Sequence, residues 1–85
     1  MKVYIPTPLR SYTKRNVVDA DGATLSELFA NLEHQFPGIR FRVINEQDEI
    51  REHIKIFVNQ SAAENLNAPL SSGDAIQIIM AISGG

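Results

Sequence analysis

Two glycines, Gly84 and Gly85, end the chain, so its final carboxylate has no side chain beside it. Glycine lacks a Cβ atom and reaches most backbone conformations, which makes such a pair narrow enough to enter a confined channel. The group that it would carry into that channel is the terminal carboxylate. The alternative is an ordinary chain end, because termini are commonly disordered and tolerant of change. The residues before the pair must decide between these interpretations.

Other groups that could do chemistry are few. His34 and His53 have no further ligands at metal-binding spacing, so we expect both to be surface or structural histidines. The carboxylates of Glu46, Glu49 and Glu52 lie in a polar segment, which favours a solvated surface over an acid/base pair. The chain also contains no cysteine, which excludes disulfides, thiolate metal sites and a cysteine nucleophile. The sequence therefore predicts neither a catalytic side chain nor a bound metal or cofactor.

Length and composition predict one small domain over residues 1–85. The content of 44% hydrophobic and 21% charged residues is typical of a globular protein and argues against disorder. A net charge of −2, with the basic residues spread along the chain, argues against nucleic-acid binding. No apolar run reaches membrane-spanning length, and the start is too weakly apolar for a signal peptide. We therefore expect a cytoplasmic protein.

The elements that must position the tail are four strands and one helix. Alternating apolar residues predict strands at residues 2–6, around 16–19, at 53–60 and at 75–82, the first two forming a hairpin with a long loop. Thr24 and Glu27 fit a capping box at the start of a helix that ends at Pro37-Gly38. Residues 38–52 are mixed and predict a helical turn or short strand followed by a loop. The helix shows one apolar stripe, made of Leu25, Leu28, Phe29, Leu32 and Phe36.

Strands that flank one amphipathic helix indicate an α+β domain with the helix packed on one face of the sheet. In the last two strands, the same alternation places Phe57, Ile79 and Ala81 on the face that the helix does not cover. Scattered exposed apolar residues are common on any surface. A contiguous group close to the tail instead indicates a surface for docking a partner, and we predict this role for the three residues.

The C-terminal half carries the most specific motif. The segment FVNQ at residues 57–60 is followed by PLSSGDAIQIIMAISGG at residues 69–85. In this pattern the chain resembles the MoaD/ThiS family of ubiquitin-like sulfur carriers, and the resemblance covers nearly the whole sequence. The segments at residues 5–13 and 51–59 are more similar to the CysO-type carriers of cysteine biosynthesis than to the small subunits of molybdopterin synthase.

The resemblance implies a β-grasp fold, with a mixed sheet wrapped on one helix and the first and last strands adjacent. It also implies that an E1-like enzyme uses ATP to adenylate the carboxylate of Gly85, after which a sulfur donor leaves a thiocarboxylate. A cysteine-synthase-like enzyme or the large subunit of molybdopterin synthase would then accept the sulfur, and thiazole synthesis is a further acceptor pathway. In this interpretation the chain is a co-substrate and not an enzyme. The tail that precedes the reactive carboxylate comprises Ile82, Ser83 and Gly84.

Two other functions fit the same residues. A ubiquitin-like protein modifier would use the same activation of Gly85 but would end in an amide bond to a lysine. A regulatory β-grasp binding domain would leave the tail inert. The first differs from a sulfur carrier in the product formed on Gly85, and the second predicts that removal of the two glycines has no effect.

Overall fold

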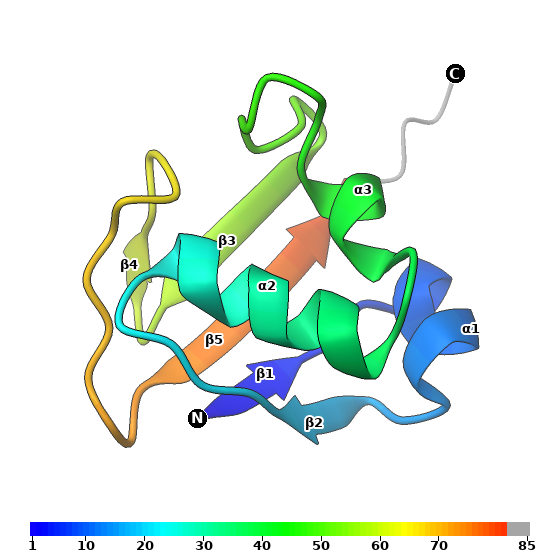
Figure 1. Ribbon diagram of the computed structural model, residues 1–85, viewed down its shortest axis with the longest axis horizontal. Coiled ribbons are helices and arrows are strands. Elements are labelled where there is room, and N and C mark those ends of the chain that lie inside the picture. Colours follow the sequence, from blue (N-terminus) through cyan, green and yellow to red (C-terminus); the bar gives the residue numbers. More distant parts are fainter. Residues whose placement is uncertain (82–85) are drawn as a thin grey trace.

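The structure, a computed structural model, describes residues 1–81. Strands lie at both ends of the chain, and the helices lie between them on either side of one further strand (Figure 1). In chain order they are β1 (Lys2–Tyr4), the 3-10 helix η1 (Thr7–Leu9), α1 (Arg10–Thr13), β2 (Val17–Asp19), α2 (Leu25–Gln35), α3 (Ile39–Val43), β3 (Ile54–Val58), β4 (Ser61–Ala62) and β5 (Ala75–Met80).

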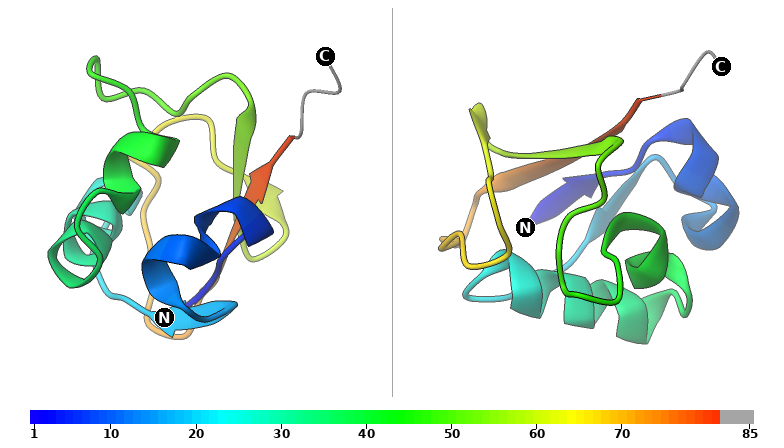
Figure 2. Two further views of the ribbon diagram at one scale, coloured as in Figure 1. Left: turned by 90° about the vertical axis from the view of Figure 1, so that its right-hand side faces the viewer. Right: turned by 90° about the horizontal axis from the view of Figure 1, so that it is seen from above.

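The strands form one mixed sheet in the order β2-β1-β5-β3-β4. β1 and β5 run parallel, and every other neighbouring pair is antiparallel. Parallel neighbours need a long connection, which α2, α3 and the middle strands supply here. Figure 2 shows α2 and α3 on one face of the sheet, whereas none of the described helices covers the opposite face. A mixed sheet on one main helix, with the first and last strands adjacent, is the predicted β-grasp arrangement and confirms the α+β class.

The main helix begins with the predicted capping box. The hydroxyl of Thr24 accepts the backbone N–H of Glu27 at 3.3 Å, and the Glu27 carboxylate accepts the N–H of Ala23 at 3.0 Å. The carboxylate therefore reaches one residue before the N-cap. At the other end, Phe36 is the C-cap and is half-buried, so α2 ends just before the last residue of the predicted stripe.

The core fills the space between α2 and the sheet. The helix contributes Leu25, Leu28, Phe29 and Leu32, all with no exposed surface. Full burial of one such side chain contributes about 1.5–3 kcal/mol to folding. The core is completed by buried residues of the strands, of η1, of α3 and of the loops: Val3, Ile5, Leu9, Val18, Ala20, Ile39, Val43, Ile44, Ile54, Ile56, Leu66, Ile76 and Ile78.

The connection between the first two strands is more ordered than predicted. It forms η1 and α1, and Leu9 is fully buried beneath them. Pro8 suits this position because proline presets φ for the first turn of a helix and needs no N–H partner there. α1 ends at Lys14, which adopts the left-handed conformation with φ 61°. One buried leucine in a polar segment gives too little periodicity to predict these short helices.

Three details of the second half differ from the prediction or refine it. The mixed segment forms a helix, α3, because Ile39 and Val43 are buried four residues apart. β4 was missed because its two residues are both exposed and show no alternation. β5 ends at Met80, whereas we predicted a strand to residue 82.

Within residues 1–81, no helix combines the length and the apolar character needed to cross a bilayer.

Candidate functional site

The C-terminal end of β5 carries the base of the predicted tail. β5 pairs with β1 on one side and with β3 on the other, so it lies inside the sheet. After Met80, the backbone N–H of Ala81 donates to the carbonyl of His53 at 2.8 Å. Ala81 is exposed and is the last described residue. The predicted tail lies outside the described residues and stays a prediction; it comprises Ile82, Ser83, Gly84 and Gly85.

The N-terminal end of β5 is held by a side-chain network. The Asn59 amide donates from Nδ2 to Oδ1 of Asp74 at 3.1 Å, and its Oδ1 accepts the backbone N–H of Ala75 at 3.0 Å. The backbone N–H of Asn59 donates to the Ala75 carbonyl at 2.7 Å. The second oxygen of Asp74 accepts the N–H of Ser71 at 2.8 Å. Asparagine is well suited here because its backbone is left-handed, with φ 58°.

This network explains the most specific part of the sequence motif. The N–H of Ser71 and the amide of Asn59 hold the pKa of the Asp74 carboxyl below its usual range, because both donors favour the charged form. Gly73 in the same turn has φ 92°, a conformation that other residues rarely adopt. The Asn and Gly-Asp of the motif are Asn59, Gly73 and Asp74. They therefore stabilise the turn before β5 and help to fix the register of this strand. They lie at the opposite end of the strand from the tail.

The uncovered face of the sheet brings the predicted docking residues together. Phe57 pairs with Gln77 and Lys55 pairs with Ile79, so Phe57 and Ile79 are diagonal neighbours on β3 and β5. Ile79 is 41% exposed, whereas Phe57 is only half-buried and contributes less surface than the alternation suggests. Their role in docking stays a prediction. Sequence analysis missed Tyr4, which is 45% exposed and pairs with Gln77 from β1.

A second exposed surface lies between α3 and the start of β3. A hollow of about 320 Å³ is lined by Phe41, Arg42, Arg51 and His53, which we call the Phe41 hollow. The Arg51 guanidinium carbon lies 4.5 Å from the centre of the Phe41 ring, and its Nε donates to the Phe41 carbonyl at 2.8 Å. Phe41 is 52% exposed, more than any other large apolar side chain among residues 1–81. No local sequence pattern predicted that these residues meet.

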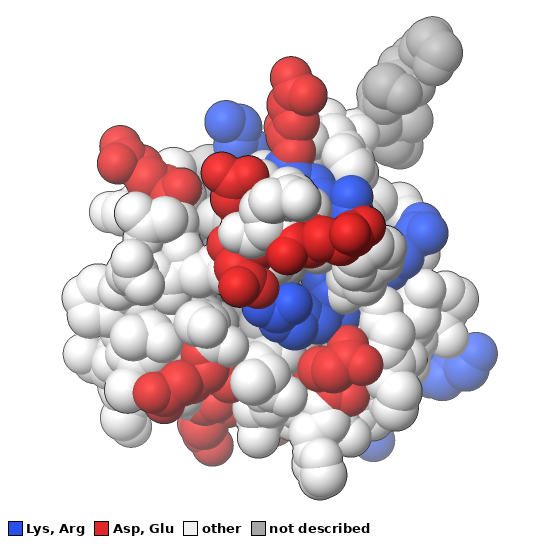
Figure 3. All heavy atoms as spheres, turned by 45° about the horizontal axis from the view of Figure 1, so that its top comes forward, with Lys and Arg blue, Asp and Glu red and all other residues white. Residues whose placement is uncertain are grey.

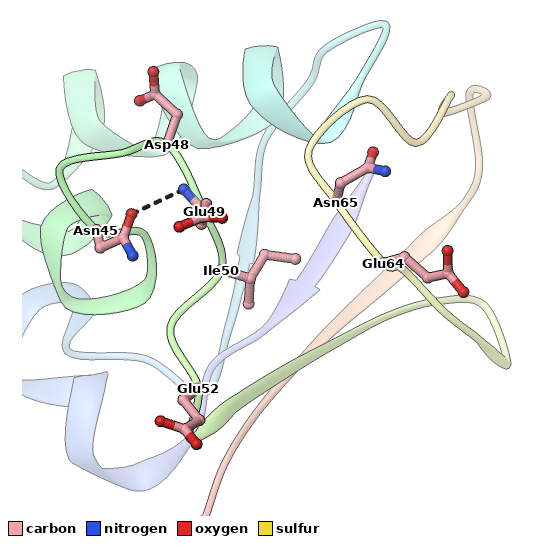
Figure 4. A pocket seen from close by; sticks show the side chains of 7 residues that line it. All are labelled: Asn45, Asp48, Glu49, Ile50, Glu52, Glu64 and Asn65. Carbon is pink, nitrogen blue, oxygen red and sulfur yellow. Dashed lines mark hydrogen bonds between the residues drawn. The ribbon is translucent and has the colours of Figure 1, made fainter.

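The acidic loop that follows α3 lines another hollow, of about 370 Å³. Figure 3 shows acidic and basic side chains intermixed at this end of the molecule. In Figure 4 the carboxylates of Asp48, Glu52 and Glu64 point in different directions, while Oδ1 of Asn45 accepts the N–H of Glu49 at 3.0 Å. Diverging carboxylates cannot coordinate one cation. The arrangement agrees with a solvated loop that Asn45 shapes.

The two histidines are exposed and lie in different elements, His34 near the end of α2 and His53 before β3. Among residues 1–81, no three His, Cys, Asp or Glu side chains gather closely enough to hold a metal ion. Every buried side-chain nitrogen and oxygen of this part of the chain has a hydrogen-bond partner. The described residues therefore show neither a metal centre nor a buried side-chain polar atom without a partner.

Comparison with known proteins agrees with these features. A family model described as the ThiS family matches residues 3–85. The sulfur carrier protein CysO of Mycobacterium tuberculosis is 32% identical over 89 residues, which cover 98% of this chain and 96% of CysO.

Solved structures are similar over the same length. The BexX/CysO complex of Amycolatopsis orientalis contains a chain that is 33% identical, with a TM-score of 0.91 over 99% of this chain and 98% of that one. Small archaeal modifier protein 1 of Haloferax volcanii is 25% identical, with a TM-score of 0.78 over 96% of this chain and 97% of that one. The match to the family model spans the sheet, the helix and the terminal glycines together, and the chain therefore belongs to the ThiS family.

Proposed function

We propose that this protein is a sulfur carrier that bears its sulfur as a thiocarboxylate on Gly85. The observation that carries the proposal is the match of the ThiS family model through the terminal Gly-Gly, together with near full-length similarity to a sulfur carrier, CysO. A chain without cysteine, in which residues 1–81 contain no group of side chains that could hold a metal ion, is consistent with a carrier that acts as a co-substrate. In this proposal the partner enzymes supply the catalysis.

The chemistry begins with a poor electrophile, because the negative charge of a carboxylate is delocalised and repels nucleophiles. An oxygen of the Gly85 carboxylate attacks the α-phosphorus of ATP on an E1-like enzyme, which forms an acyl-adenylate and releases pyrophosphate. Hydrosulfide, supplied by the sulfur donor, then attacks the acyl carbon, and AMP leaves with the former carboxylate oxygen. Loss of the hydrosulfide proton leaves a thiocarboxylate, so Gly85 carries sulfur in place of one oxygen and no oxidant or reductant is needed. ATP is bound by the partner and is not a cofactor of this chain.

The chain itself has to present Gly85 at a fixed place. Among residues 1–81, the last hydrogen bond along the chain is the one from the Ala81 N–H to the His53 carbonyl. Four residues follow, which reach at most about 14 Å when extended. This length suits a design in which the body docks at the rim of an enzyme while Gly85 enters the active site. The two terminal glycines keep the entering segment narrow.

In this proposal, the partner enzyme docks on the uncovered face of the sheet. Tyr4, Phe57 and Ile79 line that face, and Ala81 continues it toward the tail. Exposed aromatic and aliphatic side chains are the usual centre of a protein interface. The complex of a relative with BexX supports the idea that such a carrier docks on a protein partner.

The accepting pathway that we favour is cysteine biosynthesis, because the curated relatives carry the name CysO. A cysteine-synthase-like enzyme would then take the sulfur from Gly85. Molybdopterin and thiazole synthesis use carriers of the same broader family and remain alternatives. Transfer of sulfur from the loaded protein to each class of acceptor enzyme would distinguish them.

The test of carrier function is intact-mass measurement of the purified chain after incubation with an E1-like enzyme of the same organism, ATP and a sulfur donor. We expect a mass increase equal to the exchange of one oxygen for sulfur. Omission of ATP and removal of Gly84 and Gly85 are matched controls, and both should abolish the increase. An unchanged mass in the complete mixture, with no adenylate formed, would contradict the proposal.

A second candidate function is protein modification, which is favoured by the similarity to small archaeal modifier protein 1. Activation of Gly85 would be the same, but a lysine amine would displace AMP to form an amide. Isolation of the tagged protein from its own cells separates the two functions. Tail residues attached to lysines of other proteins would indicate modification, whereas free chain with a thiocarboxylate would indicate sulfur transfer.

A further inference from the structure

The Phe41 hollow lies beside the origin of the tail. His53 is one of its four residues, and the His53 carbonyl holds the N–H of Ala81. In an antiparallel ladder, directly paired residues point to the same face, so the His53 side chain lies next to Ala81. An enzyme that admits the four following residues must place the rim of its active site near this position, because they reach at most about 14 Å.

Two of the four residues that line the hollow are arginines, Arg42 and Arg51. Arg40 on the same helix pairs with Asp48 at 2.9 Å. Among residues 1–81, by contrast, neither Arg42 nor Arg51 makes a salt bridge. Arg42 is exposed. Two guanidinium groups are therefore available to carboxylates of another molecule.

The exposed ring of Phe41 also favours contact with another protein. Phe41 is more than half exposed, although burial of an aromatic side chain is strongly favourable. Arg51 already stacks on the ring, and its Nε bond to the Phe41 carbonyl fixes it there. A stacked guanidinium is weakly hydrated and preorganised, so it loses little on binding. Aromatic residues and arginine are the side chains most enriched at the energetic centres of interfaces.

We propose that the Phe41 hollow is a second docking site, which binds an acidic segment at the rim of the active site of the E1-like activating enzyme. The inference rests on the proposed function, because it assumes that the tail enters the active site of that enzyme. The uncovered sheet face would supply apolar contact, and the hollow would supply charge attraction at the base of the tail. Positive charge at this point also steers the encounter with an acidic surface.

The experiment measures carrier activation, as pyrophosphate release, against carrier concentration. We expect Arg42→Glu to raise KM about tenfold with little change in kcat, because a rim charge governs encounter more than the chemical step. Higher ionic strength should reduce the difference from the unmodified chain, because salt screens exposed charges. Phe41→Ala should raise KM about fivefold through loss of contact area.

Lys14→Glu is the matched control, since it reverses one exposed charge at the end of α1 and should leave KM unchanged. Circular dichroism of each variant separates a docking defect from misfolding. Equal KM for Arg42→Glu and Lys14→Glu, with both folded and active, would overturn the docking site while leaving the carrier function intact. A loss confined to later sulfur transfer would assign the hollow to the accepting enzyme and also overturn the proposal. Absence of activation in the unmodified chain would instead remove the proposed function and this inference with it.

Discussion

The two ends of β5 are built in different ways. At its start, Asn59 and Asp74 join the strand to β3 and to the preceding turn through several side-chain hydrogen bonds. At its end, the strand pairing continues through one backbone hydrogen bond, from Ala81 to His53, and the tail follows. The first end is determined by its own side chains, whereas the second depends on the register set elsewhere in the ladder.

One unbroken register connects the two ends. Asn59 lies opposite Ala75 at one end and His53 lies opposite Ala81 at the other, with continuous pairing of β3 and β5 between them. A shift by one residue would turn every side chain of β5 to the other face of the sheet. The network at the start of the strand therefore helps to decide where the tail begins. The motif is continuous in the sequence, but its first part stabilises the start of β5, which we call the structural end, whereas we propose a chemical role only for its last residues, which we call the chemical end.

The largest effect that we predict comes from the chemical end. Gly85→Ala should lower kcat/KM for adenylation about 100-fold, because a small displacement of the reacting carboxylate is costly and a Cβ atom widens the segment. The free energy of unfolding should be unchanged. Pyrophosphate release and urea unfolding measure the two quantities. Equal adenylation of both forms would contradict a chemical role for this end.

The structural end should give the opposite result. Asn59→Ala should reduce the free energy of unfolding by about 1–2 kcal/mol, chiefly because it places alanine in a left-handed conformation, while water replaces the exposed hydrogen bonds to Asp74 and Ala75. Activation should be nearly normal at temperatures where the variant is folded. Urea unfolding is the measurement, and Asn59→Gly is the control that removes the amide but accepts the backbone conformation. Unchanged stability in both variants would remove the contrast between the two ends.

The exposed face of β5 should give an intermediate result, with an effect on docking and little effect on stability. Ile79→Glu should raise KM for the activating enzyme about tenfold, because it places a charge in an apolar contact, while stability changes little at a side chain that is 41% exposed. Binding affinity and thermal unfolding would check both statements. Ile79→Val is the control that keeps an apolar side chain. Unchanged affinity of the folded Glu variant would move the docking surface elsewhere.

The smallest effect that we predict is on the pH dependence of the free energy of unfolding. The lowered pKa of Asp74 means that its charged form is favoured in the folded state, so it contributes stability above the ordinary Asp value of 3.8. That contribution should be lost as pH falls below this value through the lowered pKa. Urea unfolding between neutral pH and acid should show a shallower pH dependence for Asp74→Asn. Glu46→Gln, which removes one exposed carboxylate elsewhere, should keep the original dependence.

Much of the fold could be predicted because its signals are local. The Thr24 capping box and the apolar stripe of α2 lie within one helix, and the alternation of β3 and β5 lies within single strands. β4 could not be predicted in this way. It exists because Ser61 and Ala62 meet Val58 and Phe57 across the sheet, and neither residue is buried.

The candidate site could likewise be predicted only where its signals are local. Phe57 and Ile79 could be placed on one face from alternation, because successive side chains of a strand point to opposite faces. Tyr4 joins them only because β1 pairs with β5, far away in the sequence. The Phe41 hollow likewise needs α3, the acidic loop and the start of β3 to meet.

The sequence by itself determined the helix, the main strands, the family and the glycine ending, because each depends on covalent order and short-range periodicity. The tertiary structure alone decided that Asn59 serves the turn at Asp74, that Arg51 stacks on Phe41, and that the His53 carbonyl binds the N–H of Ala81. These contacts join residues that are distant along the chain. They form only when burial of the core brings the elements together, and no local pattern of residue types encodes that meeting.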